Sequence, residues 1–190
     1  PAAPLVHSQF GSNLIGEKSW QTGDVDAAFA AADFVLEETF KVHRGTSSPM
    51  ETRGLIALPE GHGSGSFRLE VIASTQSPYR LRDSLAAMLE IPAREIWVRS
   101  DCVGGGFGPK SGFYAEDFLV AWLALKSGRP VRWLEDRREH LLCARQERDQ
   151  IHDVSVAFSK TGKVIGLKDK FVYDVGAYST TIIIPWTTAY

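Results

Sequence analysis

A glycine run at residues 104–108, interrupted only by Phe107, is the feature that most constrains the fold of this chain. Consecutive glycines favour a loop, because they permit positive φ and close backbone approach, and they weaken the interior of a helix or strand. The preceding residues 95–99 read as a short strand, and residues 113–126 read as the longest helix. The segment therefore predicts a strand–loop–helix connection whose amides can form an anion-binding concavity. A tight turn that binds nothing is the alternative.

Strand and helix patterns alternate along the rest of the chain. Apolar residues at every second position predict strands, and apolar residues three or four apart predict helices. Glycine-containing breaks after residues 58 and 158 indicate two hairpins. We expect an α+β (mixed α/β) fold, with residues 1–20 as a linker or extended arm and residues 21–190 as a partial domain. The predicted strands are 34–43, 55–58, 67–73, 95–99, 131–134, 154–158 and 164–173, and two further helices are 26–33 and 78–90.

Three side-chain environments follow from these elements. In the helix at 113–126, the spacing places four apolar residues on one face, which we expect to be buried: Phe118, Ala121, Trp122 and Leu125. Cys102 closely precedes the glycine run and is expected to be a small buried apolar residue. The charged run at 135–139 is expected to be a solvent-exposed turn.

Composition and charge exclude several classes of protein. The 190 residues carry 21 basic and 23 acidic side chains, for a net charge of −2. This balance provides no basic footprint for nucleic acid or an anionic membrane, and no apolar run approaches the roughly 20 residues of a membrane-spanning helix. The two cysteines lack CxxC spacing, which favours reduced thiols in a cytosolic setting, although one disulfide between them is the alternative. We expect neither nucleic-acid nor membrane partners.

Familiar cofactor and catalytic motifs fail at identifiable positions. A phosphate-binding P-loop needs glycine directly before Lys110-Ser111, where Pro109 stands. A dinucleotide GxGxxG motif that starts at Gly104 fails at the same proline. The five histidines show neither HxxxH nor CxxH spacing, and no G-x-S-x-G segment occurs. We therefore expect no metal-ligand set among the side chains of this chain.

Several short segments carry a family resemblance. They are PMETRG at 49–54, STQSP at 74–78, GGGFGPK at 104–110, GRPVRW at 128–133, Asp136-Arg137, Arg148-Asp149 and GAY at 176–178. In their order and separation these segments resemble the large subunits of molybdenum hydroxylases, which include xanthine dehydrogenases, aldehyde oxidoreductases and aerobic carbon monoxide dehydrogenases. The resemblance runs from about residue 20 to the end of the chain. It implies that residues 21–190 are the first part of a molybdopterin-binding domain that continues beyond this chain.

The resemblance also implies a cofactor and partners. The expected cofactor is molybdopterin with molybdenum, in the cytosine dinucleotide form, and the pterin sulfurs rather than protein side chains hold the metal. Iron–sulfur clusters and FAD are expected on other domains or subunits, together with the rest of the large subunit and a small-molecule substrate. The implied reaction hydroxylates a carbon of an aldehyde or N-heterocycle with oxygen from water. A cytoplasmic location is expected, a periplasmic one is left open, and the chain alone is expected to be inactive.

Candidate site residues come from the matching segments. Gln76 is expected to donate an amide hydrogen bond to an oxo group of the cofactor, and Phe107 to face the substrate with its ring. Arg148 is expected to bind substrate or a cofactor phosphate. The alternatives are an exposed polar role for Gln76, a core role for Phe107 and a surface ion pair for Arg148. The cofactor-binding residues expected in the glycine loop are Gly104, Gly105, Gly106, Phe107 and Gly108, with Gln76 beside them.

Three other interpretations of the whole chain remain open at this point. The first is a non-catalytic scaffold or binding module that keeps the fold, and the second is a carbon monoxide dehydrogenase-like oxidoreductase. The third is an independent nucleotide-binding domain built on the glycine loop, against which Pro109 argues. The apolar run at 182–186 further predicts exposed apolar surface on this chain.

Overall fold

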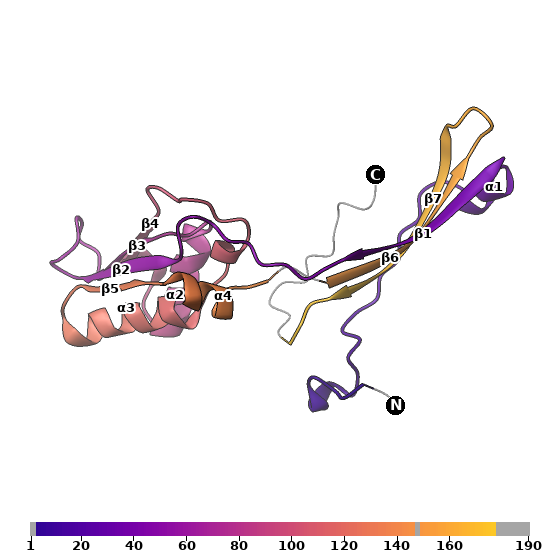
Figure 1. The fold of residues 1–190 in the computed structure, drawn as a ribbon. Helices are drawn as coiled ribbons and strands as arrows, with labels where there is room; N and C mark the ends of the chain where they lie inside the picture. Colours follow the sequence, from indigo (N-terminus) through magenta and orange to yellow (C-terminus); the bar gives the residue numbers. More distant parts are fainter. Residues whose placement is uncertain (1–2, 147–148, 178–190) are drawn as a thin grey trace. The chain divides into compact units, whose positions relative to one another are not determined.

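A computed structural model describes residues 3–146 and 149–177 of the chain (Figure 1). The chain divides into two compact units, each with its own sheet. We call Gly45–Glu147 the central unit, and Pro1–Arg44 together with Arg148–Tyr190 the flanking unit. The mixed α/β fold predicted from the sequence is confirmed, since helices and strands alternate along the chain.

The central unit contains a four-stranded sheet in the order β4-β3-β2-β5. A hairpin joins β2 to β3, as the sequence predicts, and β5 pairs antiparallel to the other edge of β2. Strand β4 runs parallel to β3, and helix α2 makes the crossover between them. The elements are β2 (Gly54–Pro59), β3 (Leu69–Ala73), α2 (Pro78–Leu89), η2 (Ala93–Glu95), β4 (Ile96–Arg99), η3 (Pro109–Ser111), α3 (Ala115–Ser127), β5 (Val131–Leu134) and α4 (Arg137–Cys143).

One hydrophobic core holds the central unit together. Alternate residues of β2 and β3, such as Leu55 and Leu69, point toward the helices and are buried. From α2, Leu81 and Leu85 enter the same cluster at a spacing of four, as the helical period requires. The core therefore lies between the sheet and the two longer helices α2 and α3.

The buried face of α3 matches the predicted one at Ala121 and at Leu125, which packs against the core, but not at Trp122. Val120, Ala121 and Ala124 are buried, whereas the Trp122 residue is 41% exposed. Small alanine side chains let the helix approach the sheet closely, and an indole at that interface would hold it away. Apolar residues of this helix occur on all of its sides, so their spacing alone did not identify the buried face.

The flanking unit contains a three-stranded antiparallel sheet in the order β1-β6-β7. The predicted strands and the hairpin after residue 158 are confirmed, although β6 begins five residues earlier than 154, at Asp149. The elements are η1 (Ser8–Phe10), α1 (Val25–Ala30), β1 (Phe34–Val42), β6 (Asp149–Phe158) and β7 (Val164–Asp174).

Helix α1 covers a small part of this sheet. The Phe29 ring packs at the position of Gly166, where a Cβ would meet the ring at 3.1 Å. Lys168 forms a 2.9 Å ion pair with Asp26 from the same helix. Ala157, which pairs with Gly166, is the one buried apolar residue of the described flanking unit. In the part of the chain that the structure describes, no helix has the length and apolarity needed to cross a membrane.

Candidate functional site

Three loops of the central unit meet around the carboxylate of Glu51. The glycine loop contributes the Gly104 amide, which donates to Glu51 Oε2 at 2.8 Å. The loop after β3 contributes the Ser74 hydroxyl, which donates to the same oxygen at 2.5 Å. Lys110, at the end of the glycine loop, donates from Nζ at 2.7 Å. A single carboxylate thus joins the segment before β2, the segment after β3 and the glycine loop.

In the Glu51–Lys110 pair, the lysine is the buried partner and depends on the carboxylate. The Lys110 side chain has no exposed surface, so its ammonium group needs this partner. Burial by itself would raise the pKa of Glu51, but hydrogen bonds from Lys110, Ser74 and the Gly104 amide, with the lysine charge, lower that pKa to about 2. Glu51 is therefore ionised throughout the physiological range. Sequence analysis did not give this pair a role, although both residues lie in the matching segments.

Gln76 lies directly against the glycine loop. Its backbone amide donates to the Lys110 carbonyl at 3.0 Å, and its side-chain Oε1 accepts the Gly108 amide at 3.0 Å. Because the amide of Gly108 is a donor, the oxygen of the Gln76 side chain must face it, which leaves Nε2 directed elsewhere as a donor. Gln76 is exposed, and no protein acceptor for Nε2 occurs among residues 3–146 and 149–177.

The glycine loop needs glycine for two different reasons. At Gly106 a Cβ would stand 2.4 Å from Cδ of Gln76, so any side chain there collides with the glutamine. At Gly105 and Gly108 the φ angles are 91° and 100°, in the region that other residues rarely adopt. Phe107 also has a positive φ, of 52°, between these glycines.

Consecutive amides of this loop have no hydrogen-bond partner. The N–H groups of Gly105, Gly106 and Phe107 make no hydrogen bond within the described residues, although Gly106 is buried. With Nε2 of Gln76, they leave the loop rich in unused donors. Free backbone N–H groups in a loop with positive-φ residues can donate hydrogen bonds to an anion or to an oxo group of a ligand. The residues present therefore fit the oxygen-rich cofactor that the sequence resemblance implies.

Phe107 is exposed and is not packed into the core. The residue is 71% exposed, and its carbonyl accepts a hydrogen bond from the Ser47 hydroxyl at 3.1 Å. The core role considered as an alternative is therefore wrong. The ring lies against Gly105, where a Cβ would stand 2.8 Å from Cε2 of Phe107, and its exposed side can contact a planar molecule.

A buried ionic network supports the loops from beneath. Glu135 accepts hydrogen bonds from the Arg53 side chain and backbone, at 2.5–3.0 Å. His140, which has no exposed side-chain surface, contacts Glu135 Oε2 at 2.8 Å and the Ser47 carbonyl at 2.9 Å. Burial alone would raise the pKa of Glu135, but the hydrogen bonds from Arg53 and His140 lower it overall. The prediction that the run 135–139 is a solvent-exposed turn is therefore wrong at Glu135, and helix α4 begins within the run.

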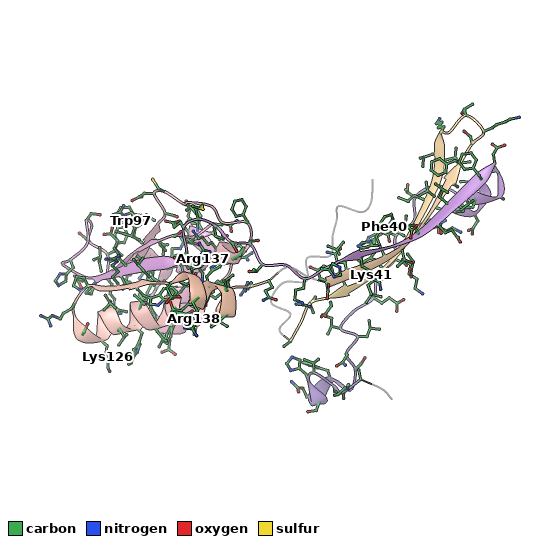
Figure 2. All side chains as sticks on the ribbon, viewed as in Figure 1. Phe40, Lys41, Trp97, Lys126, Arg137 and Arg138 are labelled. Carbon is green, nitrogen blue, oxygen red and sulfur yellow. The ribbon has the colours of Figure 1, made fainter. Side chains whose placement is uncertain are left out.

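Further contacts connect α3 and α4 to the same loops. The Tyr114 hydroxyl donates to the Pro109 carbonyl at 2.6 Å, and the Arg53 guanidinium lies 3.7 Å from the centre of the Tyr114 ring. Arg137, labelled in Figure 2, donates to the backbone carbonyls of Pro49 and Met50. These contacts explain why the PMETR and DR segments recur together: both belong to the support of one loop cluster.

Two other sequence expectations have clear outcomes. Cys102 is exposed, so the prediction of a buried apolar cysteine is wrong. It lies in an extended loop that the sheet does not cover. Cys143 is also exposed, and both thiols are free. Arg148 lies outside the described residues, as does the apolar run at 182–186.

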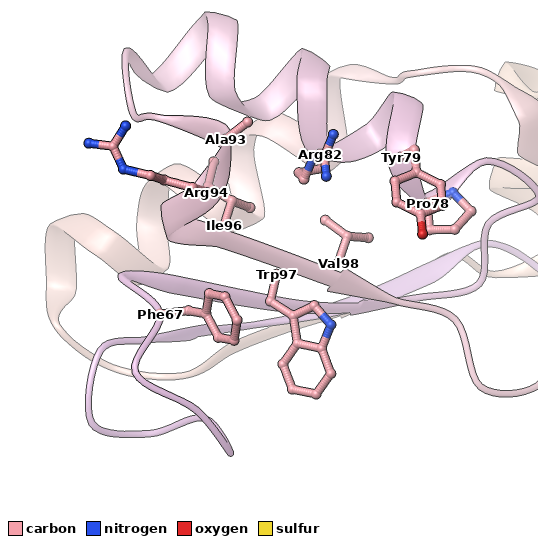
Figure 3. A pocket seen from close by; sticks show the side chains of 9 residues that line it. All are labelled: Phe67, Pro78, Tyr79, Arg82, Ala93, Arg94, Ile96, Trp97 and Val98. Atoms are coloured by element: carbon pink, nitrogen blue, oxygen red, sulfur yellow. The ribbon is translucent and has the colours of Figure 1, made fainter.

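A groove of the central unit lies apart from this cluster. Figure 3 shows a groove of about 360 Å³ beside α2 and the edge strand β4, with Phe67 and Trp97 on one side. Of its arginines, Arg82 already has an acidic partner, since it pairs with Asp83 at 2.7 Å. Neither Gln76 nor the glycine loop lines it. In the described stretches, no three His, Cys, Asp or Glu side chains are grouped to hold a metal ion.

Comparison with known proteins gives the family. The chain matches the family model described as "Molybdopterin cofactor-binding domain" over residues 6–190. It is 32% identical over 156 residues to the "6-hydroxypseudooxynicotine dehydrogenase complex subunit gamma" of Paenarthrobacter nicotinovorans, covering 82% of this chain and 19% of the relative. It is 33% identical over 180 residues to one subunit of a probable xanthine dehydrogenase from Bacillus subtilis, covering 95% of this chain and 23% of the relative.

A solved structure agrees with these matches. Quinoline 2-oxidoreductase from Pseudomonas putida 86 superposes with a TM-score of 0.70 at 36% identity, over 82% of this chain and 19% of that one. The chain belongs to the molybdopterin cofactor-binding domain family of molybdenum hydroxylase large subunits, and the resemblance predicted from its motifs is confirmed. It spans about a fifth of the length of the relatives that it matches.

Proposed function

We propose that this chain is the part of an oxidoreductase large subunit that holds the molybdenum cofactor beside the substrate. The full subunit would hydroxylate a carbon of an N-heterocycle or aldehyde with oxygen from water. The observation that carries the proposal is the set of unused donors on the glycine loop and Gln76, in a chain of this family. Relatives named for the N-heterocycles xanthine and quinoline are 33% and 36% identical to this chain. Carbon monoxide dehydrogenases also match, at 28–31% identity, and the higher values favour the N-heterocycle class.

The residues of this chain would act by positioning. The cofactor supplies two-electron redox chemistry at molybdenum when it is bound. Nε2 of Gln76 and the amides of Gly105, Gly106 and Phe107 would donate hydrogen bonds to its oxygen atoms and so fix its orientation. The exposed ring of Phe107 would form an apolar wall against a flat substrate and exclude water from one side of it. Arg148 would bind substrate or a cofactor phosphate.

The finer features of the assembly belong to the same proposal. We infer the cytosine dinucleotide form of the cofactor, because backbone donors in a glycine loop suit the additional phosphates. Iron–sulfur clusters and FAD would lie on other domains or subunits and carry electrons away. The enzyme would be cytoplasmic, and this chain by itself would be inactive because it spans about a fifth of its relatives.

Molybdenum content tests the cofactor role. The full-length large subunit is purified with its partner subunits, and molybdenum is measured by mass spectrometry for the parent, for Gly106→Val and for Gly16→Val. Gly106→Val places a side chain against Gln76, so we expect at least a tenfold loss of bound metal. At Gly16 a Cβ would meet no atom within 4 Å and φ is not positive, so its variant should retain the metal.

The alternatives give different results in the same experiment. A parent without molybdenum, produced in cells that make the cofactor, would indicate the non-catalytic scaffold. A metal-loaded parent that oxidises carbon monoxide but no N-heterocycle or aldehyde would indicate the carbon monoxide dehydrogenase-like activity. Equal metal in both glycine variants would remove the glycine loop from the cofactor site.

A further inference from the structure

One face of the flanking sheet is apolar and uncovered. Paired residues on neighbouring strands point to the same side of a sheet, so the register defines its two faces. We call the apolar face the side that carries Phe34, Leu36, Phe40 and Val42 from β1, with Val164 and Leu167 from β7. Each of these side chains belongs to a residue that is 46–60% exposed. The same side also carries four polar side chains, of which His152 and Asp169 contact each other at 2.9 Å; the other two are Glu38 and Gln150.

The opposite face carries more charge and fewer apolar side chains, although Val35, Ile151 and Val172 lie on it. It carries Lys41, which follows Phe40 on β1 (both labelled in Figure 2), and the paired residues Asp153 and Lys170. Helix α1 packs on this second face, because Phe29 contacts Gly166 there. The sheet thus has the alternation of a strand set with one buried and one solvated face, but the apolar side has no cover within the described residues.

We propose that another part of the same large subunit covers the apolar face, an inference that rests on the proposed function. This chain spans 19% and 23% of two of its relatives, so most of such a subunit lies outside it and is available as the cover. A broad apolar face is typical of a permanent interface, which resembles a domain core divided in two. A sheet or helix with an apolar face would pack about 10 Å above the strands.

A carboxylate on the apolar face indicates which charge the covering segment carries. Glu38 lies on the apolar face, on β1 between Leu36 and Phe40. Its carboxylate accepts a hydrogen bond from the Thr39 amide at 3.2 Å and forms no ion pair with residues 3–146 or 149–177. A carboxylate covered by apolar groups needs a cation. The covering segment therefore carries a lysine or arginine opposite Glu38.

Thiol labelling of the full-length large subunit, purified with its partner subunits, tests this interface. Leu36→Cys places a thiol on the apolar face, and Val172→Cys places one on the opposite face. The two native residues are 60% and 66% exposed in this chain, so the variants are matched. Maleimide labelling is followed by mass spectrometry of the separate peptides, because Cys102 and Cys143 also react. Each rate is normalised to the rate in urea.

We expect the Leu36→Cys thiol to react at least tenfold more slowly than the Val172→Cys thiol. Phe40→Cys, on the same face, should be protected to the same degree, and it replaces Leu36→Cys if that variant does not fold. Equal rates on the two faces, whether fast or slow, would overturn the proposal. Protection that disappears on dilution would assign the face to a second copy, and protection that disappears without the partner subunits would assign it to one of them; either result overturns the proposal.

Molybdenum measured on the same preparations separates this inference from the proposed function. A metal-free subunit with a protected apolar face would contradict the cofactor role and leave the interface supported. A metal-loaded subunit with a freely labelled apolar face would contradict the interface and leave the cofactor role supported.

Discussion

The central and flanking units are built from similar strands but stabilised differently. In the central unit, helices cover the sheet, and residues such as Leu55, Leu69 and Leu85 share one buried cluster. In the flanking unit, Ala157 is the one buried apolar residue among those described. Ordering a residue costs about 1–2 kcal/mol in backbone entropy, and burial of apolar surface is the main term that offsets this cost. The same alternating pattern therefore gives an independently stabilised unit in one case and half of an interface in the other.

The described residues of the candidate site, Gln76 and the glycine loop, all lie on the better stabilised unit. Its loops are joined by Glu51 and Lys110 above and by Arg53, Glu135 and His140 below. Functional loops need such support, because a displacement of about 1 Å in a donor weakens its hydrogen bond to a ligand. The difference between the units thus separates the part that we propose positions the cofactor from the part that we propose contacts the rest of the subunit.

Breaking the buried ionic network should have the largest effect on stability. Arg53→Met removes the partner of Glu135, whose side chain has no exposed surface, and leaves its charge uncompensated. We expect a loss of about 3–5 kcal/mol in the central unit. Amide hydrogen exchange of β2 and β3 measures this loss, with Asp83→Asn as the control.

The control removes an ion pair of similar length at the surface. Arg82 and Asp83 pair at 2.7 Å, but their side chains are 34% and 61% exposed. Such pairs contribute about 0–1 kcal/mol because water screens them. If Arg53→Met were as mild as Asp83→Asn, the network would not support the loops.

A matched pair of leucine truncations should sharpen the comparison of the two units. Leu85→Ala removes a fully buried side chain from the central core and should cost about 2–5 kcal/mol. Leu36→Ala, at a residue that is 60% exposed, should cost less than about 0.5 kcal/mol in the chain of residues 1–190. Hydrogen exchange of the strand or helix that holds each residue gives both values.

The same Leu36→Ala change should become more costly in the full-length large subunit, where the apolar face is covered. A cost that stays small in the full subunit would indicate that the face remains open there. A large cost in the short chain would show that the flanking sheet has a core of its own.

Secondary structure was largely predictable from local patterns. Hairpins around Gly61 and Gly162 follow from glycine positions, and the strand at 34–42 follows from its alternation. The buried face of α3 was only partly predictable, because apolar residues occur on all sides of that helix and only the three-dimensional packing buries Ala124 and leaves Trp122 exposed. Local periodicity reports which residues are apolar, but it does not report which neighbours cover them.

The candidate site was predictable only where a motif carried it. Gln76 and the glycine loop came from the family resemblance, and the structure places them in contact. Glu135 was missed because charged residues are usually exposed, and its buried partner Arg53 is 82 residues away. Long-range pairing of this kind leaves no signal in a window of sequence. Arg53 lies in a segment that resembles the family, but Glu135 lies between two such segments and in neither of them.

The Glu51–Lys110 contact predicts a dependence of stability on pH. Glu51 has a pKa of about 2 against an ordinary value of 4.5. A carboxylate whose pKa is depressed in the folded state stabilises that state above its unfolded pKa, and the contribution is lost as pH falls from 4.5 toward 2. Glu51→Gln should therefore flatten the decline of stability over this window and lower stability at pH 7.

The urea midpoint of the central unit, followed by near-ultraviolet circular dichroism between pH 7 and pH 2, measures both changes. Glu17→Gln is the control, because its carboxylate lies in the exposed segment before α1 and forms no ion pair in the described chain. The Glu51 side chain is 43% exposed, so solvent screening reduces the pH-dependent part of the effect. The Lys110 side chain is fully buried, so its ammonium group loses its partner in Glu51→Gln at any pH. An unchanged pH profile in Glu51→Gln would mean that the glycine loop does not depend on this carboxylate. The support of the loop would then come from the buried network alone.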